Sequence, residues 1–444
     1  MKSKKTFLSN FFPTSLWIKK LLANTGWMGF AQVVRVIENL IRSIVLARFL
    51  GLETFGAYAT AMAFVSLISE IVNLNLGTII LTFGTRYRMN SETLKLKALI
   101  KLSYIASVMV IIASGMFSLF VLWLVHNTIF NVSGLFLIVS LLAFAASFNL
   151  IDQTNKGILR LFDKFKLSCV IDVILSFINI TFTIGILTLV SSDLHHAIYT
   201  SIFGLLAVGT VSSAVVFFVL SKKLPDLWWS PIIVLRKDTS ILLKTTFSNS
   251  VSLTLQRISR KIDILILAAL APGSSVGLYD VGKKVSAMIL LPRDAIALAA
   301  FPQISDALSA GKHARVYFLL NRFLLFAVPF VILSALCIWL ASEYLINLLF
   351  GELFLPASTI LTILSITSLL YLVFFWSGAV LLQLSLLREQ MLSTLICLII
   401  IVSLAYLLGS WYQGLGVAWS MVIGTFFQFL IVYLTTLRKL SSYR

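Results

Sequence analysis

Eight lysine and arginine side chains lie inside hydrophobic stretches, where charged residues are rare. They occur in only three of these stretches, near residues 24–48, 241–270 and 276–304. A charge at the bilayer centre costs at least about 2.5–3.5 kcal/mol, so such residues usually face a bundle interior or a watery cavity. Cations there can neutralise an anionic substrate, and arginine suits bidentate contacts with phosphate. The candidate substrate-binding residues are therefore Arg35, Arg42, Arg257, Arg260, Lys261, Lys283, Lys284 and Arg293.

The first stretch shows how these charges are arranged. Arg35, Glu38, Asn39 and Arg42 fall within an arc of roughly 100° on one face of a single helix. A second face, on the next stretch, carries Glu70 among serine, asparagine and glycine residues, and we expect it to form a cavity wall beside the first.

The acids in these stretches are too few to neutralise the cations. Four of them, including Asp294, stand against the eight cations of the three cationic stretches, and the excess calls for an anionic partner or water. Local alternatives remain: Arg35 or Arg260 could pair with an acid three residues on, and two lysines could extend to the interface. The candidate counter-charges or coupling groups are Glu38, Glu70, Asp263 and Asp280.

Two further stretches carry polar stripes without a cation excess. One includes Asn149, Asp152 and Lys156, and the other includes Asp172 and Asn179. We interpret them mainly as hydrogen bonding between neighbouring helices.

Composition excludes an ordinary soluble domain. Apolar residues make up 59% of the chain, charged residues only 12%, and the mean hydropathy is +1.01. The net charge of +18 does not indicate nucleic-acid binding, because 26 of the 35 lysine and arginine residues lie in one alternating set of connections. That asymmetry places both termini in the cytoplasm, beside anionic lipid.

Twelve hydrophobic stretches predict an all-α membrane protein with two six-helix lobes. The expected organisation is an interfacial segment (1–23), an N-lobe (24–220), a cytoplasmic linker (221–240), a C-lobe (241–437) and a cytoplasmic tail (438–444).

An internal repeat supports two related halves. Residues 44–58 align without a gap on residues 265–279, at an offset of 221, and match Gly56 with Gly277 and Tyr58 with Tyr279. In the second half, Pro292 removes a backbone donor and predicts a kinked or broken helix, which at mid-membrane often marks a binding region.

No constellation for catalysis, metal binding or cofactor binding is found. The four histidines lie in connections between the hydrophobic stretches, and metalloprotease, hydrolase-elbow and phosphate-loop motifs are missing from the sequence. We expect a transporter rather than an enzyme, without a resident cofactor.

Two segments resemble a known family: LARFLGLETFGAYATAMAFVSLISEIVNLNLG and KIDILILAALAPGSSVGLYDVGKKVSAMILLPRDAIALAAFPQIS. They are similar to the Wzx-type polysaccharide flippases of the multidrug/oligosaccharidyl-lipid/polysaccharide exporter superfamily. The resemblance implies a V-shaped cavity lined chiefly by transmembrane helices one, two, seven and eight. It also implies a multi-pass protein of the bacterial inner membrane.

The resemblance further implies the substrate and partners. The substrate would be an undecaprenyl-pyrophosphate-linked oligosaccharide, moved to the periplasmic leaflet for O-antigen or another surface polysaccharide. A polysaccharide polymerase and a chain-length regulator are possible partners, and a proton gradient, a sodium gradient or the membrane potential could drive transport. The alternatives are a drug/cation antiporter of the same superfamily, an integral-membrane polymerase or ligase, and a purely structural bundle.

Overall fold

The computed structural model describes residues 15–129, 135–189, 193–293, 313–384 and 386–442, together with 296–297, 304, 307–308 and 310–311. Within these residues the chain is helical and forms no strand. This follows from the hydrophobic sequence, because a helix satisfies its backbone hydrogen bonds within one segment and can therefore cross hydrocarbon. The predictions for residues 1–14 and for Asp294 concern positions outside the described residues.

The first half contains six labelled helices. They are α2 (Ser15–Val72), α3 (Leu76–Met89), α4 (Thr93–Ile129), α5 (Leu135–Leu161), α6 (Phe165–Leu189) and α7 (Leu194–Lys223). The helix α2 contains the first hydrophobic stretch and most of the second, and it turns at Gly51, whose φ of 74° suits glycine. It already begins at Ser15, within the segment expected to lie along the interface, and no proline or glycine interrupts it before Gly26.

The second half begins, after α7, with two short 3-10 turns. Its elements are η1 (Leu227–Trp229), η2 (Ile232–Leu235), α8 (Thr239–Ile258), α9 (Ile262–Leu270), α10 (Gly273–Ala287), η3 (Met288–Leu290), α12 (His313–Phe350), η4 (Glu352–Phe354), α13 (Ala357–Val373), α14 (Ser377–Gln383) and α15 (Leu387–Ser441). The predicted break near Pro292 is present. The helix α10 ends at Ala287 and becomes a 3-10 turn, because Pro292 has no N–H to donate to the carbonyl of Met288.

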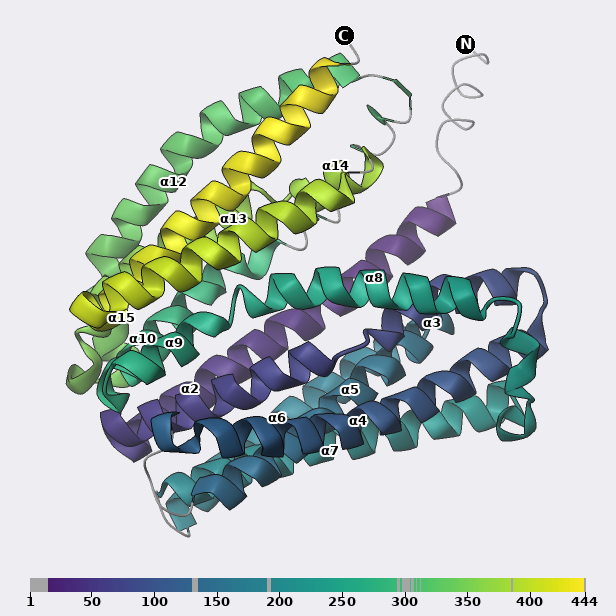
Figure 1. Cartoon of the computed structure of the whole chain (residues 1–444), viewed down its shortest axis with the longest axis horizontal. Helices are drawn as coiled ribbons and strands as arrows, with labels where there is room; N and C mark the ends of the chain where they lie inside the picture. The colour runs from purple at the N-terminus through teal and green to yellow at the C-terminus, as the bar shows by residue number, and fades with distance from the viewer. Residues whose placement is uncertain are drawn as a thin grey trace.

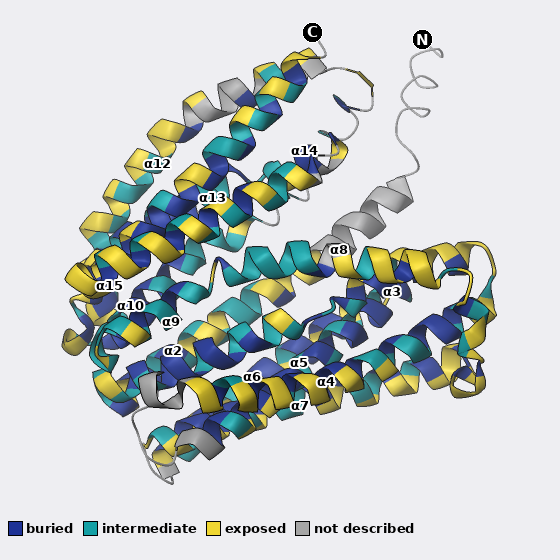
Figure 2. Cartoon of the chain, in the orientation of Figure 1, coloured by how far each residue is buried: buried dark blue, intermediate teal, exposed yellow. Residues whose placement is uncertain are grey.

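The helices form two groups that meet at one end. Figure 1 shows α3 to α7 in one group and α9 to α15 in the other, with α2 and α8 between them. The groups converge where α2 packs against α10, and they diverge toward the end at which α15 ends and α8 begins. Figure 2 shows exposed residues along the outer faces of α4, α12 and α15, where large apolar side chains such as Trp123, Trp339 and Trp411 suit contact with lipid.

Small residues allow the close crossing of the two groups. A Cβ added at Gly56 would lie 1.8 Å from the carbonyl oxygen of Gly273, and one at Gly277 would lie 2.7 Å from that of Leu52. Beside this crossing, the fully buried ring of Phe55 meets Phe354 edge to face at 6.1 Å. The converging end is therefore sealed by backbone contact and an apolar core.

Candidate functional site: a charged cavity on the N-lobe side

A polar cavity of about 630 Å³ lies mainly within the first helix group. Its wall comes from α2, α3, α5, α6 and α7, and the second half adds Leu253, Arg257 and Lys261. None of the described lining residues belongs to α10. The expected lining by helices one, two, seven and eight is therefore wrong in part, because the fourth, fifth and sixth helices (α5, α6 and α7) contribute and the described part of the eighth does not.

One break in a helix borders this cavity in the first half. Between α2 and α3 the chain leaves the helical conformation at residues 73–75, and Asn75 adopts a left-handed conformation with φ of 50°. The side chain of Asn73 accepts a hydrogen bond from the backbone N–H of Asn75 at 2.8 Å. Its amide nitrogen donates to Gln153 on α5 at 3.0 Å. These asparagines therefore satisfy polar groups that the missing helical turn would otherwise bond.

A second break separates α8 from α9 at residues 259–261. Arg257 lies in the last turn of α8, and Lys261 immediately precedes α9. The break turns both cations toward the first half of the chain. Discontinuous helices of this kind form substrate and ion sites in transporters, because irregular backbone is tolerated where it lines a cavity.

These two cations converge on one carboxylate across the boundary between the halves. Arg257 Nη1 lies 2.6 Å from Glu70 Oε2, and Lys261 Nζ lies 3.2 Å from Glu70 Oε1. Lys261 also donates to the hydroxyl of Ser66 at 3.0 Å. We name Glu70, Arg257 and Lys261 the bridging cluster, and its net charge is +1.

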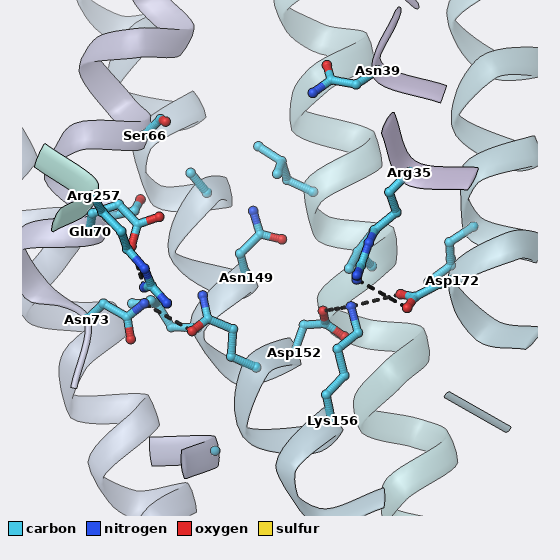
Figure 3. Close-up of a pocket in the computed structure, with 18 of the residues that line it drawn as sticks. Arg35, Asn39, Ser66, Glu70, Asn73, Asn149, Asp152, Lys156, Asp172 and Arg257 are labelled. Atoms are coloured by element: carbon cyan, nitrogen blue, oxygen red, sulfur yellow. Dashed lines mark hydrogen bonds and ion pairs between the residues drawn. The ribbon is translucent and has the colours of Figure 1, made fainter. Parts of the chain in front are cut away.

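A second cluster lies within the first half. Arg35 Nη1 lies 3.2 Å from Asp172 Oδ2, and Lys156 Nζ lies 2.8 Å from the other oxygen of that carboxylate. Lys156 also lies 2.5 Å from Asp152 Oδ2. These four residues form the N-lobe cluster, whose charges balance. Figure 3 shows it facing Arg257 and Glu70, with Asn149 drawn between the two groups.

Three more charged residues line the cavity without an ion pair within 4 Å to any described residue: Glu38, Arg42 and Arg160. Arg42 instead donates to the hydroxyl of Tyr58 at 3.1 Å, and that hydroxyl lies 2.8 Å from Ser201 Oγ. Six cations and four acids thus line the described cavity, a net charge of +2.

Four of the eight predicted cations reach the cavity: Arg35, Arg42, Arg257 and Lys261. The other four lie elsewhere, which corrects their predicted convergence. Arg260 is exposed, and its Nε donates to the carbonyl of Gln256 at 3.1 Å. Arg293 donates to the carbonyl of Tyr371 at 3.1 Å.

The remaining two predicted cations, both lysines, pair with acids of the second half. Lys283 Nζ lies 2.7 Å from both oxygens of Asp263, which is fully buried and also accepts a hydrogen bond from Tyr279 at 2.6 Å. Lys284 Nζ lies 2.6 Å from Asp280. Among the predicted counter-charges, Glu38 and Glu70 therefore lie at the cavity, whereas Asp263 and Asp280 form separate pairs.

The charged residues of α5 and α6 were not predicted as site residues. The stripes containing Asp152, Lys156 and Asp172 do bond between helices, as expected, but they also line the cavity together with Arg160. A lysine and two aspartates within hydrophobic stretches were the available signal. The face of the second stretch around Glu70 is confirmed as a cavity wall.

Comparisons with known proteins agree with this architecture. A family model described as polysaccharide biosynthesis protein matches residues 21–308. No curated protein sequence matches the chain significantly.

Solved structures with the same fold are MATE transporters. An inward-facing multidrug resistance transporter of the MATE family and MOP superfamily has a TM-score of 0.76 at 15% identity, with 91% of this chain and 94% of that one covered. An outward-facing structure of such a transporter has a TM-score of 0.64 at 17% identity, with 96% of each chain covered. A MATE transporter of Vibrio cholerae in the bent form gives 0.59 at 16% identity, covering 96% of this chain and 98% of that one. At these identities the likeness establishes the fold.

The family match spans more than half of the chain and includes the helices that build the cavity. The protein is a multi-pass membrane protein with the fold of MATE transporters of the MOP superfamily, and it belongs to the polysaccharide biosynthesis protein family.

Proposed function

We propose that this protein flips an undecaprenyl-pyrophosphate-linked oligosaccharide from the cytoplasmic to the periplasmic leaflet of the bacterial inner membrane. The repeat unit would serve the synthesis of O-antigen or another surface polysaccharide. A diphosphate joined to a hydrophilic glycan cannot cross hydrocarbon unaided, so a flippase must offer it cations and a watery path.

The bridging cluster is the observation that carries this proposal. Its two cations share one carboxylate, so an arriving diphosphate can replace Glu70 as the anion held by Arg257 and Lys261. Arginine matches phosphate oxygens with two parallel hydrogen bonds. The N-lobe cluster has no net charge and therefore attracts a further anion less strongly than the bridging cluster does. The diphosphate therefore sits on the bridging cluster.

The same cluster links binding to movement of the lobes. Glu70 belongs to α2, whereas its two cationic partners lie at the break between α8 and α9. Displacing Glu70 breaks a contact between the halves. The polyprenyl tail stays in lipid while the lobes rock and expose the cavity to the other side.

Transport against a gradient needs an energy source, and the displaced carboxylate offers a place for it. Once freed from its cations, Glu70 can take up a proton or a sodium ion. Glu38 also lines the cavity, has no ion pair among the described residues, and is the second candidate for this role. The membrane potential could act on the same charges.

Substitution of Arg257 tests the proposal. Charge-assisted hydrogen bonds contribute about 1.5–3 kcal/mol, so we expect Arg257→Ala to slow flipping roughly ten- to a hundredfold, and Arg257→Lys to retain part of the rate. The matched control is Arg260→Ala, which removes an exposed arginine of the same break outside the cavity. The readout is the rate at which the lipid-linked oligosaccharide crosses the membrane of reconstituted vesicles. Full activity of Arg257→Ala would contradict the proposal.

A drug/cation antiporter is the second candidate. It is favoured by the multidrug transporters among the structural neighbours and by the four acids at the cavity. Ethidium efflux from vesicles discriminates the two functions. The flippase proposal predicts no efflux above that of protein-free vesicles, because cations outnumber acids in the cavity. Efflux that requires Glu38 or Glu70 would favour the antiporter.

A further inference from the structure

Uncharged polar side chains that line the same cavity as the two charged clusters are not explained by diphosphate binding. We name Asn39, Ser69, Asn149, Ser176 and Asn179 the amide wall. They line the cavity from three helices, α2, α5 and α6. Figure 3 shows Asn149 between the clusters and Asn39 farther along the cavity.

The amide wall lacks partners within the described part of the chain. No hydrogen bond reaches the side chains of Asn39, Asn149 or Asn179, in contrast to Asn73, which bonds to Gln153. Two wall atoms, Asn179 Oδ1 and Ser69 Oγ, are buried without a hydrogen bond. These two atoms are closed to a ligand, whereas Asn39 is exposed and Asn149 is half-buried, so a ligand that enters the cavity can hydrogen-bond to the amides of Asn39 and Asn149.

The chemistry of the wall matches sugars better than phosphate. A side-chain amide offers two donors and one acceptor oxygen, and a hydroxyl both donates and accepts. Sugar hydroxyl and acetamido groups also combine donors and acceptors. A fully ionised diphosphate, in contrast, has acceptor oxygens and no donor. The wall contains no cation, so it adds no electrostatic attraction for the diphosphate.

The position of the wall also fits the geometry of a lipid-linked sugar. The bridging cluster joins the two halves, and the wall begins on the α2, α5 and α6 side of it. A diphosphate on Arg257 and Lys261 would therefore share one cavity with the wall residues of α5 and α6, which its first sugars could contact.

We propose that the amide wall is a glycan subsite that binds the hydroxyl and acetamido groups of the sugars next to the diphosphate. This inference rests on the proposed function, because it assumes that the diphosphate occupies the bridging cluster. It assigns the diphosphate to the boundary between the lobes and the sugar to the N-lobe.

Two lipids separate the subsite from the diphosphate site: undecaprenyl pyrophosphate, and the same lipid carrying N-acetylglucosamine. Their affinities are measured with the full-length protein in lipid nanodiscs. The wild type is expected to bind the sugar-bearing lipid more tightly. Asn149→Ala and Asn179→Ala should each weaken binding of that lipid about three- to tenfold and leave binding of the bare lipid unchanged.

Two control variants complete the experiment. Asn347→Ala removes an exposed amide on α12, outside the cavity, and should bind both lipids like the wild type. Arg257→Ala should weaken binding of both lipids by the same factor. Thermal unfolding of each variant identifies any that fails to fold. If Asn149→Ala fails, Asn149→Ser replaces it.

The outcomes distinguish the two claims. Equal binding of both lipids by the wild type, or amide variants that lose both lipids equally, would overturn the glycan subsite while leaving the flippase proposal intact. If Arg257→Ala binds both lipids like the wild type, the diphosphate site itself is wrong.

Discussion

The two lobes use matching positions for opposite purposes. At the repeat offset of 221, Arg42 corresponds to Asp263, and Tyr58 corresponds to Tyr279. In each lobe the tyrosine hydroxyl hydrogen-bonds the charged residue sixteen positions before it, at 3.1 Å in the first lobe and 2.6 Å in the second. One scaffold thus holds a cation in the N-lobe and an anion in the C-lobe.

The partners of these two charges differ. The half-buried Lys283 neutralises the fully buried Asp263, whereas the position equivalent to Lys283 in the N-lobe is Met62, which cannot pair with a charge. Arg42 therefore faces the cavity with only hydroxyl support. A charge that one partner neutralises, as Lys283 neutralises Asp263, therefore contributes to packing. A cation that is unpaired, such as Arg42, or that shares one carboxylate with a second cation, such as Arg257, remains available to an anionic ligand.

The largest expected effect concerns the crossing that both lobes share. Gly56→Val would place its Cβ against the carbonyl of Gly273 and force the lobes apart at their converging end. We expect flipping to be lost and thiol reagents to reach cysteines introduced beside position 56. Gly29→Ala is the control, because a Cβ at Gly29 meets nothing within 4 Å. Normal transport by Gly56→Val would refute the close crossing.

Breaking the C-lobe pair should destabilise the protein more than removing its N-lobe counterpart. Asp263→Ala leaves the half-buried Lys283 without its anion, so the loss should approach, from below, the roughly 3–5 kcal/mol typical of a broken buried pair. The double variant Asp263→Leu with Lys283→Met should recover most of that loss. Unfolding in detergent micelles measures both. A single variant as stable as the wild type would show that Asp263 is not the buried anion.

The N-lobe counterpart, Arg42, should matter less for stability and more for flipping. Arg42→Ala removes one hydrogen bond, and Tyr58 keeps its contact with Ser201, so we expect a stability loss of only about 0.5–1.5 kcal/mol. Flipping should fall severalfold, because an unpaired cation has left the cavity. Equal losses of stability in Arg42→Ala and Asp263→Ala would remove the contrast between the lobes.

A smaller effect is expected at Arg48, which links the lobes near their converging end. Its guanidinium donates to the carbonyls of Leu348 and Leu349, at 2.7 and 2.9 Å, where α12 ends. Both bonds are exposed, so Arg48→Ala should shift the lobes toward separation at this end by only a few fold. Distances between spin labels on α2 and α12 measure that shift. An unchanged distance distribution would show that Arg48 does not hold the lobes together.

The smallest effect concerns the linker between the lobes. Tyr87 donates a hydrogen bond to Asp238 at 2.8 Å, and Lys95 forms an ion pair with the same carboxylate at 3.2 Å. The hydrogen bond from Tyr87 and the charge of Lys95 hold the pKa of Asp238 below its usual value of 3.8. The stability that this adds is fully present above pH 3.8 and is lost as the pH falls through the lower folded pKa. Asp238→Asn should therefore flatten the decline in melting temperature below pH 4. An identical decline in the wild type and the variant would exclude Asp238 as its source.

The sequence predicted the class of fold and one face of the site. The polar faces of the first two stretches were correct because helical spacing alone determines which side chains share a face. The pairing of Asp263 with Lys283 could not be predicted, since it depends on how α9 and α10 pack against each other. The same holds for Lys156 and Asp172, which meet only because α5 lies beside α6. The break at residues 73–75 has a signal in the sequence, namely Asn73 and Asn75 followed by Gly77. That this break lines the cavity could be seen only in the structure.

The most direct test is a structure of the protein bound to an undecaprenyl-pyrophosphate-linked oligosaccharide. We expect the diphosphate within about 3.2 Å of the side chains of Arg257 and Lys261. We also expect Glu70 to be displaced from both cations. A diphosphate held by Lys283 and Lys284 in the C-lobe, with the pairs of Glu70 intact, would contradict it.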